Sequence, residues 1–211
     1  MTGTVATAAT ADARVTPQNP SGYVREVVKT LKTPEGLKAK VGFSRGKAKI
    51  QPSRAITPFS NRFTVSGSGW GQVTDFGKSS SQAANVETGY IVACQVGVDS
   101  ATAGAGAQLG AIALAAFGGA LPAGAAGPFA TVSGNVSVTV SPGTAKRITF
   151  GNKSIDAPRL METFGVRYNS VEVSVDKCGG NIDAVAYTTL STSNRQFDAS
   201  KTIYGQLVRV R

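Results

Sequence analysis

The sequence has no histidine and only two cysteines among its 211 residues. An ordinary zinc site needs several Cys or His ligands, so this chain cannot assemble one on its own. Nucleophile systems that depend on a histidine, such as Ser–His–Asp and Cys–His, are excluded for the same reason. An enzyme would have to use carboxylates, lysine, tyrosine or a bound cofactor, and no paired carboxylates or activated nucleophile stand out. We therefore expect no enzymatic activity, no metal site and no cofactor.

Charge is also scarce, and it is unevenly distributed. Only 16% of the residues are charged, with 22 Lys and Arg against 12 Asp and Glu, for a formal net charge of +10. Residues 12–62 hold eleven basic and three acidic side chains, whereas the 46 residues 100–145 hold no charged side chain at all. A hydrophobic fraction of 41% argues against a disordered chain, and the length suits one substantial domain with its own core.

The two cysteines, Cys94 and Cys178, are 84 positions apart. This spacing matches neither a metal-binding motif nor a redox motif. One interpretation is a disulfide that closes a long loop in an oxidising compartment. The other is a pair of buried free thiols in a cytosolic core, and the spacing favours neither. Residues 1–13 lack the basic and compact apolar regions of a signal peptide. If the protein is exported, we expect its signal peptide to be absent from this chain.

Short alternating segments predict an antiparallel β domain. Pro and Gly interrupt the chain about every eight to twelve residues, and no helical periodicity of useful length is present before residue 100. Strands are predicted within 23–28, 36–43, 63–67, 87–98, 166–168, 171–175 and 184–190. The basic stretch 23–62 could contact nucleic acid, but it contains no recognition helix and no phosphate-binding loop. A solvated strand face is the favoured interpretation of that stretch.

Residues 100–130 differ in kind from the rest, because 13 of these 31 residues are Ala and 7 are Gly. The apolar run 109–126 contains Gly118, Gly119, Pro122 and Gly124, which disfavour a membrane helix. Leu and Phe side chains within the segment also argue against a simple flexible linker. We expect an Ala/Gly-rich strand in a crowded or lipid environment, which folds back on itself at tight turns.

Residues 130–141 alternate strictly between apolar and small neutral polar side chains. Ten such residues at ~3.3 Å each cover roughly 30 Å, the hydrocarbon thickness of a bilayer. The alternatives are a strand of a transmembrane barrel and a half-exposed strand of a soluble sandwich; the lack of Lys and Glu favours the barrel. In a barrel, Val132, Val136, Val138 and Val140 would face lipid, and the opposite parity would line the lumen, namely Thr131, Ser133, Asn135, Ser137 and Thr139.

Several short motifs, in their order and spacing, resemble those of the MspA-like porins of mycolic-acid-containing actinobacteria. They cover roughly residues 55–207 and comprise Ala55-Ile56-Thr57-Pro58, Asn61-Arg62, Val65-Ser66-Gly67, Thr88–Val96, Val140–Gly143, Val175–Gly180 and Ile203-Tyr204-Gly205. The resemblance implies a goblet-shaped homo-oligomer, typically of eight chains, in the outer (mycolic-acid) membrane. Small hydrophilic solutes and ions would diffuse passively through it. The resemblance also implies that Cys94 and Cys178 are paired.

The fold class expected from the resemblance is all-β, with a sandwich-like rim domain and one long hairpin contributed to a shared transmembrane β-barrel. Residues 1–54 would form a basic arm and the first strands, a part of the chain with no clear family counterpart. Residues 55–90 and 142–211 would form the rim, and residues 91–141 the hairpin stem with its turn near 118–127. One hairpin has unpaired edges, so several copies must close the barrel in contact with membrane lipids.

The pore is expected to be neutral at its narrowest part. Gln95, Gly97 and Asp99 on the descending strand could face the lumen, and the constriction candidates are Leu114, Phe117, Leu121 and Phe129. Known relatives place acidic side chains near the hairpin turn, whereas residues 118–127 contain none. Without an acidic ring, the net positive charge predicts weak selectivity or a preference for anions.

A second hypothesis belongs to a different class of protein. A soluble capsid-like or structural β-sandwich could use the basic N-terminal part to contact nucleic acid, with the uncharged segment as an intersubunit loop. Extraction only with detergent and discrete conductance steps would favour the porin, for which we expect no nucleic-acid partner. For the porin, a hetero-oligomer with a second, similar chain is an alternative to the homo-oligomer.

Overall fold

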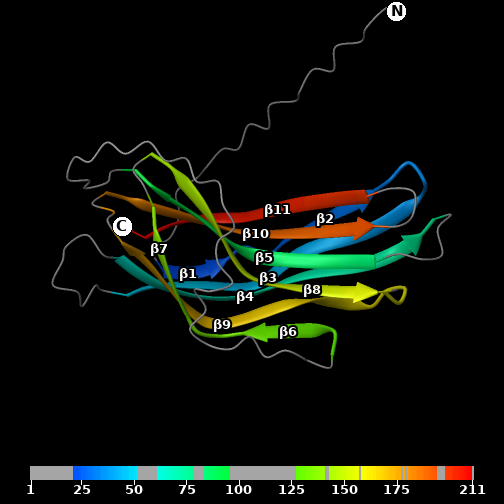
Figure 1. The fold of residues 1–211 in the computed structure, drawn as a ribbon, viewed down its shortest axis with the longest axis horizontal. Coiled ribbons are helices and arrows are strands. Elements are labelled where there is room, and N and C mark those ends of the chain that lie inside the picture. The colour runs from blue at the N-terminus through cyan, green and yellow to red at the C-terminus, as the bar shows by residue number, and fades with distance from the viewer. Residues whose placement is uncertain are drawn as a thin grey trace, which may run out of the picture.

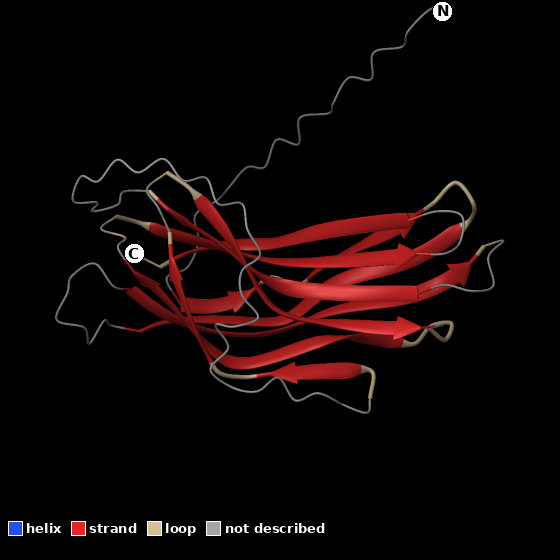
Figure 2. Cartoon of the chain, in the orientation of Figure 1, coloured by secondary structure: helices blue, strands red, loops and turns tan. Residues whose placement is uncertain are grey.

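The computed structural model describes residues 21–51, 61–77, 83–95, 127–140, 143–156, 158–176, 178, 180–193 and 198–210. Its regular elements in these ranges are all β-strands (Figure 2), and they form two sheets that pack face to face (Figure 1). No helix in the described ranges is long and apolar enough to cross a membrane. The predicted all-β, sandwich-like rim domain is therefore confirmed.

The larger sheet has seven strands built around β3 (Leu37–Gln51), β4 (Asn61–Phe76) and β9 (Thr163–Asp176). These three strands pair antiparallel in that order. On one side, β1 (Ser21–Val24) and β2 (Val27–Lys32) both pair antiparallel with β3. On the other side, β6 (Phe129–Val132) and β7 (Asn135–Thr139) both run parallel to β9.

The smaller sheet has four strands in the order β11 (Asp198–Arg209), β10 (Ile182–Ser193), β5 (Ala83–Cys94) and β8 (Ala145–Asp156). All of its neighbours are antiparallel. Each strand that the alternating sequence predicts from residue 63 onward, outside 100–141, lies at least partly in one of these elements. The strand predicted over 87–98 is described only as far as Cys94.

Strand periodicity places the core between the two sheets. In β3, Leu37, Val41 and Phe43 are buried, whereas the intervening Lys38 and Lys40 are exposed. The centre of the core is aromatic, with ring centroids 5.0 to 6.4 Å apart among Phe63, Tyr90, Phe150 and Tyr168. These rings come from both sheets, so they hold the two layers together through apolar burial.

Two glycines lie where backbones approach too closely for a side chain. A Cβ at Gly89 would collide with the carbonyl of Ile148, beside the irregularity in the β5–β8 pairing. A Cβ at Gly165 would collide in the same way with the carbonyl of Gly69, on the neighbouring strand β4. Glycine is therefore required at both positions by the approach of the strands.

The prediction for residues 129–140 is wrong in one respect. The segment is extended and alternating as expected, but β6 and β7 are strands of the sandwich rather than the return limb of a hairpin. The four valines predicted to face lipid are 2 to 6% exposed and belong to the core, namely Val132, Val136, Val138 and Val140. Both environments are apolar, so the alternating pattern does not distinguish a core from a lipid face. Residues 91–94 of the predicted stem likewise belong to the sandwich, because they end β5 and pair with β8 and β10. Residues 96–126 of the predicted stem lie outside the described residues.

Candidate functional site

The candidate site is the end of the sandwich where the chain leaves β5 for the uncharged segment. Three backbone hydrogen bonds hold this exit: the N–H of Gly143 donates to the carbonyl of Cys94 (3.0 Å), that of Gln95 to Asn181 (3.1 Å) and that of Cys94 to Thr144 (3.4 Å). The exit is thus fastened on both sides, to the chain preceding β8 and to the chain preceding β10. These contacts anchor the chain as far as Gln95.

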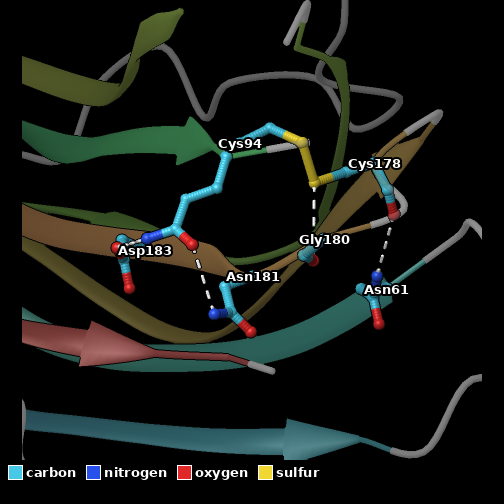
Figure 3. Close-up of a disulfide and its surroundings, with 7 residues drawn as sticks. Asn61, Cys94, Cys178, Gly180, Asn181 and Asp183 are labelled. Carbon is cyan, nitrogen blue, oxygen red and sulfur yellow. Dashed lines mark hydrogen bonds between the residues drawn. A yellow bond between two sulfur atoms is a disulfide. The ribbon is translucent and has the colours of Figure 1, made fainter. Parts of the chain in front are cut away.

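A disulfide joins Cys94 to Cys178 at the same place (Figure 3), so the implied pairing is confirmed. Cys94 ends β5 of the smaller sheet, and Cys178 lies just after β9 of the larger one. Both residues are almost completely buried. The side-chain amide of Asn61 donates to the carbonyl of Cys178 (3.5 Å), which adds a contact from β4. The covalent bond therefore ties the two layers together at the exit.

Gln95, a predicted pore-lining residue, lies exposed on this exit. Its carboxamide accepts a hydrogen bond from the Asn181 side chain (3.2 Å) and donates one to Asp183 (3.3 Å). Asp183 also accepts a hydrogen bond from the guanidinium of Arg209 (3.1 Å), and Figure 3 shows Asn181 and Asp183 among the residues that surround the disulfide. Sequence reasoning missed these partners. The position of Asn181 directly after the Cys178-Gly179-Gly180 motif is the signal that points to them.

The polar residues of the alternating segment keep their exposed parity. Their side chains lie exposed along β6, β7 and the short link between them, and they are Thr131, Ser133, Asn135, Ser137 and Thr139. Ser137 donates a hydrogen bond to Asp176 of β9 (2.9 Å). These residues form a continuous hydrophilic margin of the larger sheet, and whether water in a pore covers it stays a prediction.

The remaining predicted pore residues divide into two groups. Gly97, Asp99, Leu114, Phe117 and Leu121 lie outside the described residues. Phe129, predicted at the constriction, instead begins β6, and the guanidinium of Arg167 lies 4.0 Å from its ring centroid. Phe129 therefore belongs to the sandwich, because β6 pairs with β9 and places Phe129 opposite Gly165.

A polar cluster covers the outer face of the smaller sheet. The Glu87 carboxylate accepts hydrogen bonds from Tyr187 (2.8 Å), Arg147 (2.8 Å) and Thr149 (2.9 Å), and the Arg147 guanidinium lies 4.0 Å from the Tyr187 ring centroid. Burial tends to raise the pKa of Glu87, but the hydrogen bonds of Tyr187 and Thr149 and the charge of Arg147 outweigh it and lower that pKa. Burial raises the pKa of Tyr187 to about 12, so its hydroxyl stays protonated.

The outer face of the larger sheet is basic. Exposed side chains along β3 include Lys38, Lys40, Arg45, Lys47 and Lys49. Within the described ranges, Lys38 is paired with an acid (Asp75, 3.2 Å), whereas the other four form no ion pair. The basic excess predicted from the sequence is therefore an exposed strand face, as expected. No three potential His, Cys, Asp or Glu metal ligands lie together in the described part of the chain.

Comparison with known proteins agrees with this architecture. A protein-family model described as MspA matches residues 35–208, a range that contains both cysteines and the uncharged segment. The match begins within the stretch 1–54, which was expected to lack a family counterpart, and it includes β3. The expectation is therefore wrong for residues 35–54, whereas residues 1–34 lie outside the match. No curated protein matches the chain.

Proposed function

Because this chain belongs to the MspA family, whose members are oligomeric porins of the mycobacterial outer membrane and not enzymes, we propose that its copies enclose a water-filled channel for small hydrophilic solutes and ions. The observation that carries the proposal is the family match over 35–208, which covers β3 to β10, nearly all of β11 and the uncharged residues 100–145. Passive diffusion through the channel requires no catalytic group.

The membrane-spanning part of each protomer is a hairpin within residues 96–126. These 31 residues contain no charge except Asp99, and they follow the fastened end of β5. A transmembrane strand needs about 9–11 residues, so two strands and a turn fit this length. A single hairpin leaves its backbone edges unpaired in lipid, so neighbouring copies supply the missing hydrogen bonds. Eight copies would give a barrel of sixteen strands.

The surface that faces the water of the channel has two parts, the base of the hairpin at Gln95 and the constriction within the hairpin. Gln95 stands at the base of the hairpin, and Gly97 and Asp99 follow it toward the lumen. Leu114, Phe117 and Leu121 form a neutral constriction, because no acidic side chain occurs in 100–145. The exposed polar margin on β6 and β7 faces the water of the wider vestibule. Without an acidic ring at the constriction, the basic outer faces give the channel weak selectivity or a preference for anions.

Recording from planar lipid bilayers tests the proposal. Purified, detergent-extracted protein should insert and produce discrete conductance steps, and heat-unfolded protein from the same preparation should not. A tenfold KCl gradient then gives the reversal potential, whose sign reports weak or anion selectivity. A detergent-free assembly that binds nucleic acid and never conducts would contradict the channel and favour the capsid-like alternative. Strong cation preference would contradict the neutral constriction alone.

A further inference from the structure

The one tryptophan of the chain lies in a depression on the outer face of the larger sheet. Trp70 comes from the middle of β4, and the depression around it has a volume of about 360 Å³. It is bordered by Arg45 of β3 on one side and by Arg167 of β9 on the other. This volume falls in the lower range of small-molecule sites in proteins. The channel has no need of such a feature on a β-sandwich.

The indole ring of Trp70 lies across the backbone of β3. Gly42 is its direct cross-strand partner, and a Cβ built on Gly42 would collide with the six-membered part of the indole. The absence of a side chain at Gly42 therefore lets the ring rest against the strand, with part of it exposed to solvent. Its indole N–H makes no hydrogen bond within the described ranges. A flat, partly exposed ring of this kind is a surface on which another ring can pack.

Two guanidinium groups border this aromatic floor. Arg45 has a φ of 55°, in the left-handed region that non-glycine residues rarely adopt, and it lies at the irregularity in the pairing of β3 with β4. Such irregularities re-aim side chains, and strained residues are concentrated at functional sites. Arg167 is held on the other side by its stacking on Phe129. Neither guanidinium forms an ion pair in the described part of the chain. Both are free to bind a phosphate or carboxylate, for which the planar guanidinium is well shaped.

The remaining polar groups of the depression are acceptors and hydroxyls. The side-chain nitrogen of Gln72 donates to the carbonyl of Met161 (2.7 Å) and lies 3.2 Å from the Thr163 hydroxyl, which fixes the amide and leaves its oxygen as an acceptor. Glu26 borders the depression and offers a carboxylate to a hydroxylated ligand. The charges of the lining, two arginines and one glutamate, balance a single negative group rather than a polyanion.

We propose that this depression binds a small anionic sugar, that is, a monosaccharide with one phosphate or carboxylate group. The sugar ring packs on Trp70, and its anionic group lies between Arg45 and Arg167. The sugar hydroxyls donate hydrogen bonds to the side-chain oxygens of Gln72 and Glu26. Each part of the ligand is matched by a different group of the site. The site belongs to the rim domain, so the binding proposal and the proposed channel function can each fail without the other.

Intrinsic fluorescence tests the proposal directly, since Trp70 is the chain's one tryptophan. The full-length protein in detergent is titrated with glucose 6-phosphate, glucuronate, glucose and inorganic phosphate. The two anionic sugars should shift or quench the emission saturably, and glucose and phosphate should do so only at concentrations at least about tenfold higher. An equal response to inorganic phosphate would mean anion binding without recognition of the sugar and would overturn the proposal. No response to either anionic sugar would also overturn it.

Charge-matched variants separate a site from general electrostatic attraction. Arg45→Asn, with a residue that tolerates the left-handed conformation, and Arg167→Gln should each raise the apparent dissociation constant at least about tenfold, the loss expected for one charge-assisted contact. Lys49→Gln removes the same charge from the same face of β3 but outside the depression, and it should change that constant less than about twofold. Circular dichroism checks that each variant is folded. If Lys49→Gln weakens binding as much as Arg45→Asn does, the proposal is wrong.

Discussion

At the residue scale, Glu87 illustrates how one carboxylate organises a surface. Its three hydrogen-bond donors come from β8 and β10, the two strands on either side of β5. Tyr187, although it is on the outer face of the sheet, is 1% exposed. Its burial is consistent with the contacts of Arg147 and Glu87. The sequence offers no sign of this cluster, because its members are separated by as many as 100 positions.

The lowered pKa of Glu87 predicts a defined pH dependence of stability. A carboxylate whose pKa is lower in the folded state stabilises that state above its unfolded pKa, about 4.3, and this stabilisation is lost as pH falls through the folded pKa. Glu87→Gln should therefore lower the free energy of unfolding by roughly 1 kcal/mol at pH 7, a modest value because the side chain is 33% exposed. The difference should shrink as pH falls below the unfolded pKa and be lost once the folded-state carboxylate is protonated. Thermal unfolding followed by circular dichroism at several pH values measures it, and a difference that grows at low pH would contradict it.

Gly89 gives a second residue-scale prediction. Gly89→Ala should destabilise the protein by about 1–3 kcal/mol or more, because the new methyl group would meet the backbone of β8, which cannot move without breaking the sheet. Gly127→Ala is the matched control, since nothing lies within 4 Å of a Cβ there. The melting temperature should fall for the first variant and stay within a degree or two for the second. Equal melting temperatures for the two variants would show that β8 shifts to accommodate the methyl group, and would contradict the prediction.

At the scale of elements, β7 shows what the alternation of the sequence can predict and what it cannot. Its alternation correctly predicts an extended strand and which parity is apolar. The pattern contains no information on what covers the apolar side, and valine suits a protein core as well as lipid. The deciding fact is the parallel pairing of β7 with β9, a contact between segments nearly 40 positions apart, such as Ser137 and Asp176. Local sequence cannot specify that pairing, whereas the fold class follows from the strand pattern repeated along the chain. For the candidate site, the cysteine spacing left the pairing open, and the family resemblance resolved it correctly.

The disulfide is the element that fixes the exit, and its removal has a predictable cost. Cys94 and Cys178 are 84 residues apart, and closing a loop of this length stabilises a protein by about 4–5 kcal/mol in the chain-entropy account. Full reduction should lower the melting temperature markedly. The double variant Cys94→Ala/Cys178→Ala should start at the lower value and be insensitive to reductant. A wild-type protein that melts at the same temperature after thiol counting proves complete reduction would contradict the prediction.

At the scale of the whole molecule, charge other than Asp99 is segregated from residues 96–126, the segment proposed to cross the membrane. The basic excess lies on exposed strands such as β3, and residues 100–145 are uncharged. Any ion preference then arises from the electrostatic field of side chains that are exposed to water. Salt screens such a field efficiently. A ring of charges at the constriction itself would be screened much less.

This segregation predicts that selectivity depends on ionic strength. The permeability ratio of chloride to potassium should exceed one near 0.1 M KCl and approach one near 1 M, because the Debye length falls from about 10 Å to about 3 Å. Reversal potentials measured at a constant concentration ratio and at several absolute concentrations provide the ratio. The conductance steps serve as the internal control that the channel itself is unchanged. A ratio that stays constant with salt would locate the selecting charges inside the narrow part of the pore.

The disulfide also determines what a cut in the chain would do. The bond encloses all residues between Cys94 and Cys178, so the uncharged segment and β6 to β9 form one covalent ring. A protease that cleaves anywhere within that ring leaves the two fragments joined. Cleaved protein should therefore migrate as one species on a non-reducing gel and as two on a reducing gel. Because the sandwich strands on both sides of such a nick remain linked, a protomer nicked in its uncharged segment would keep its place in the assembly.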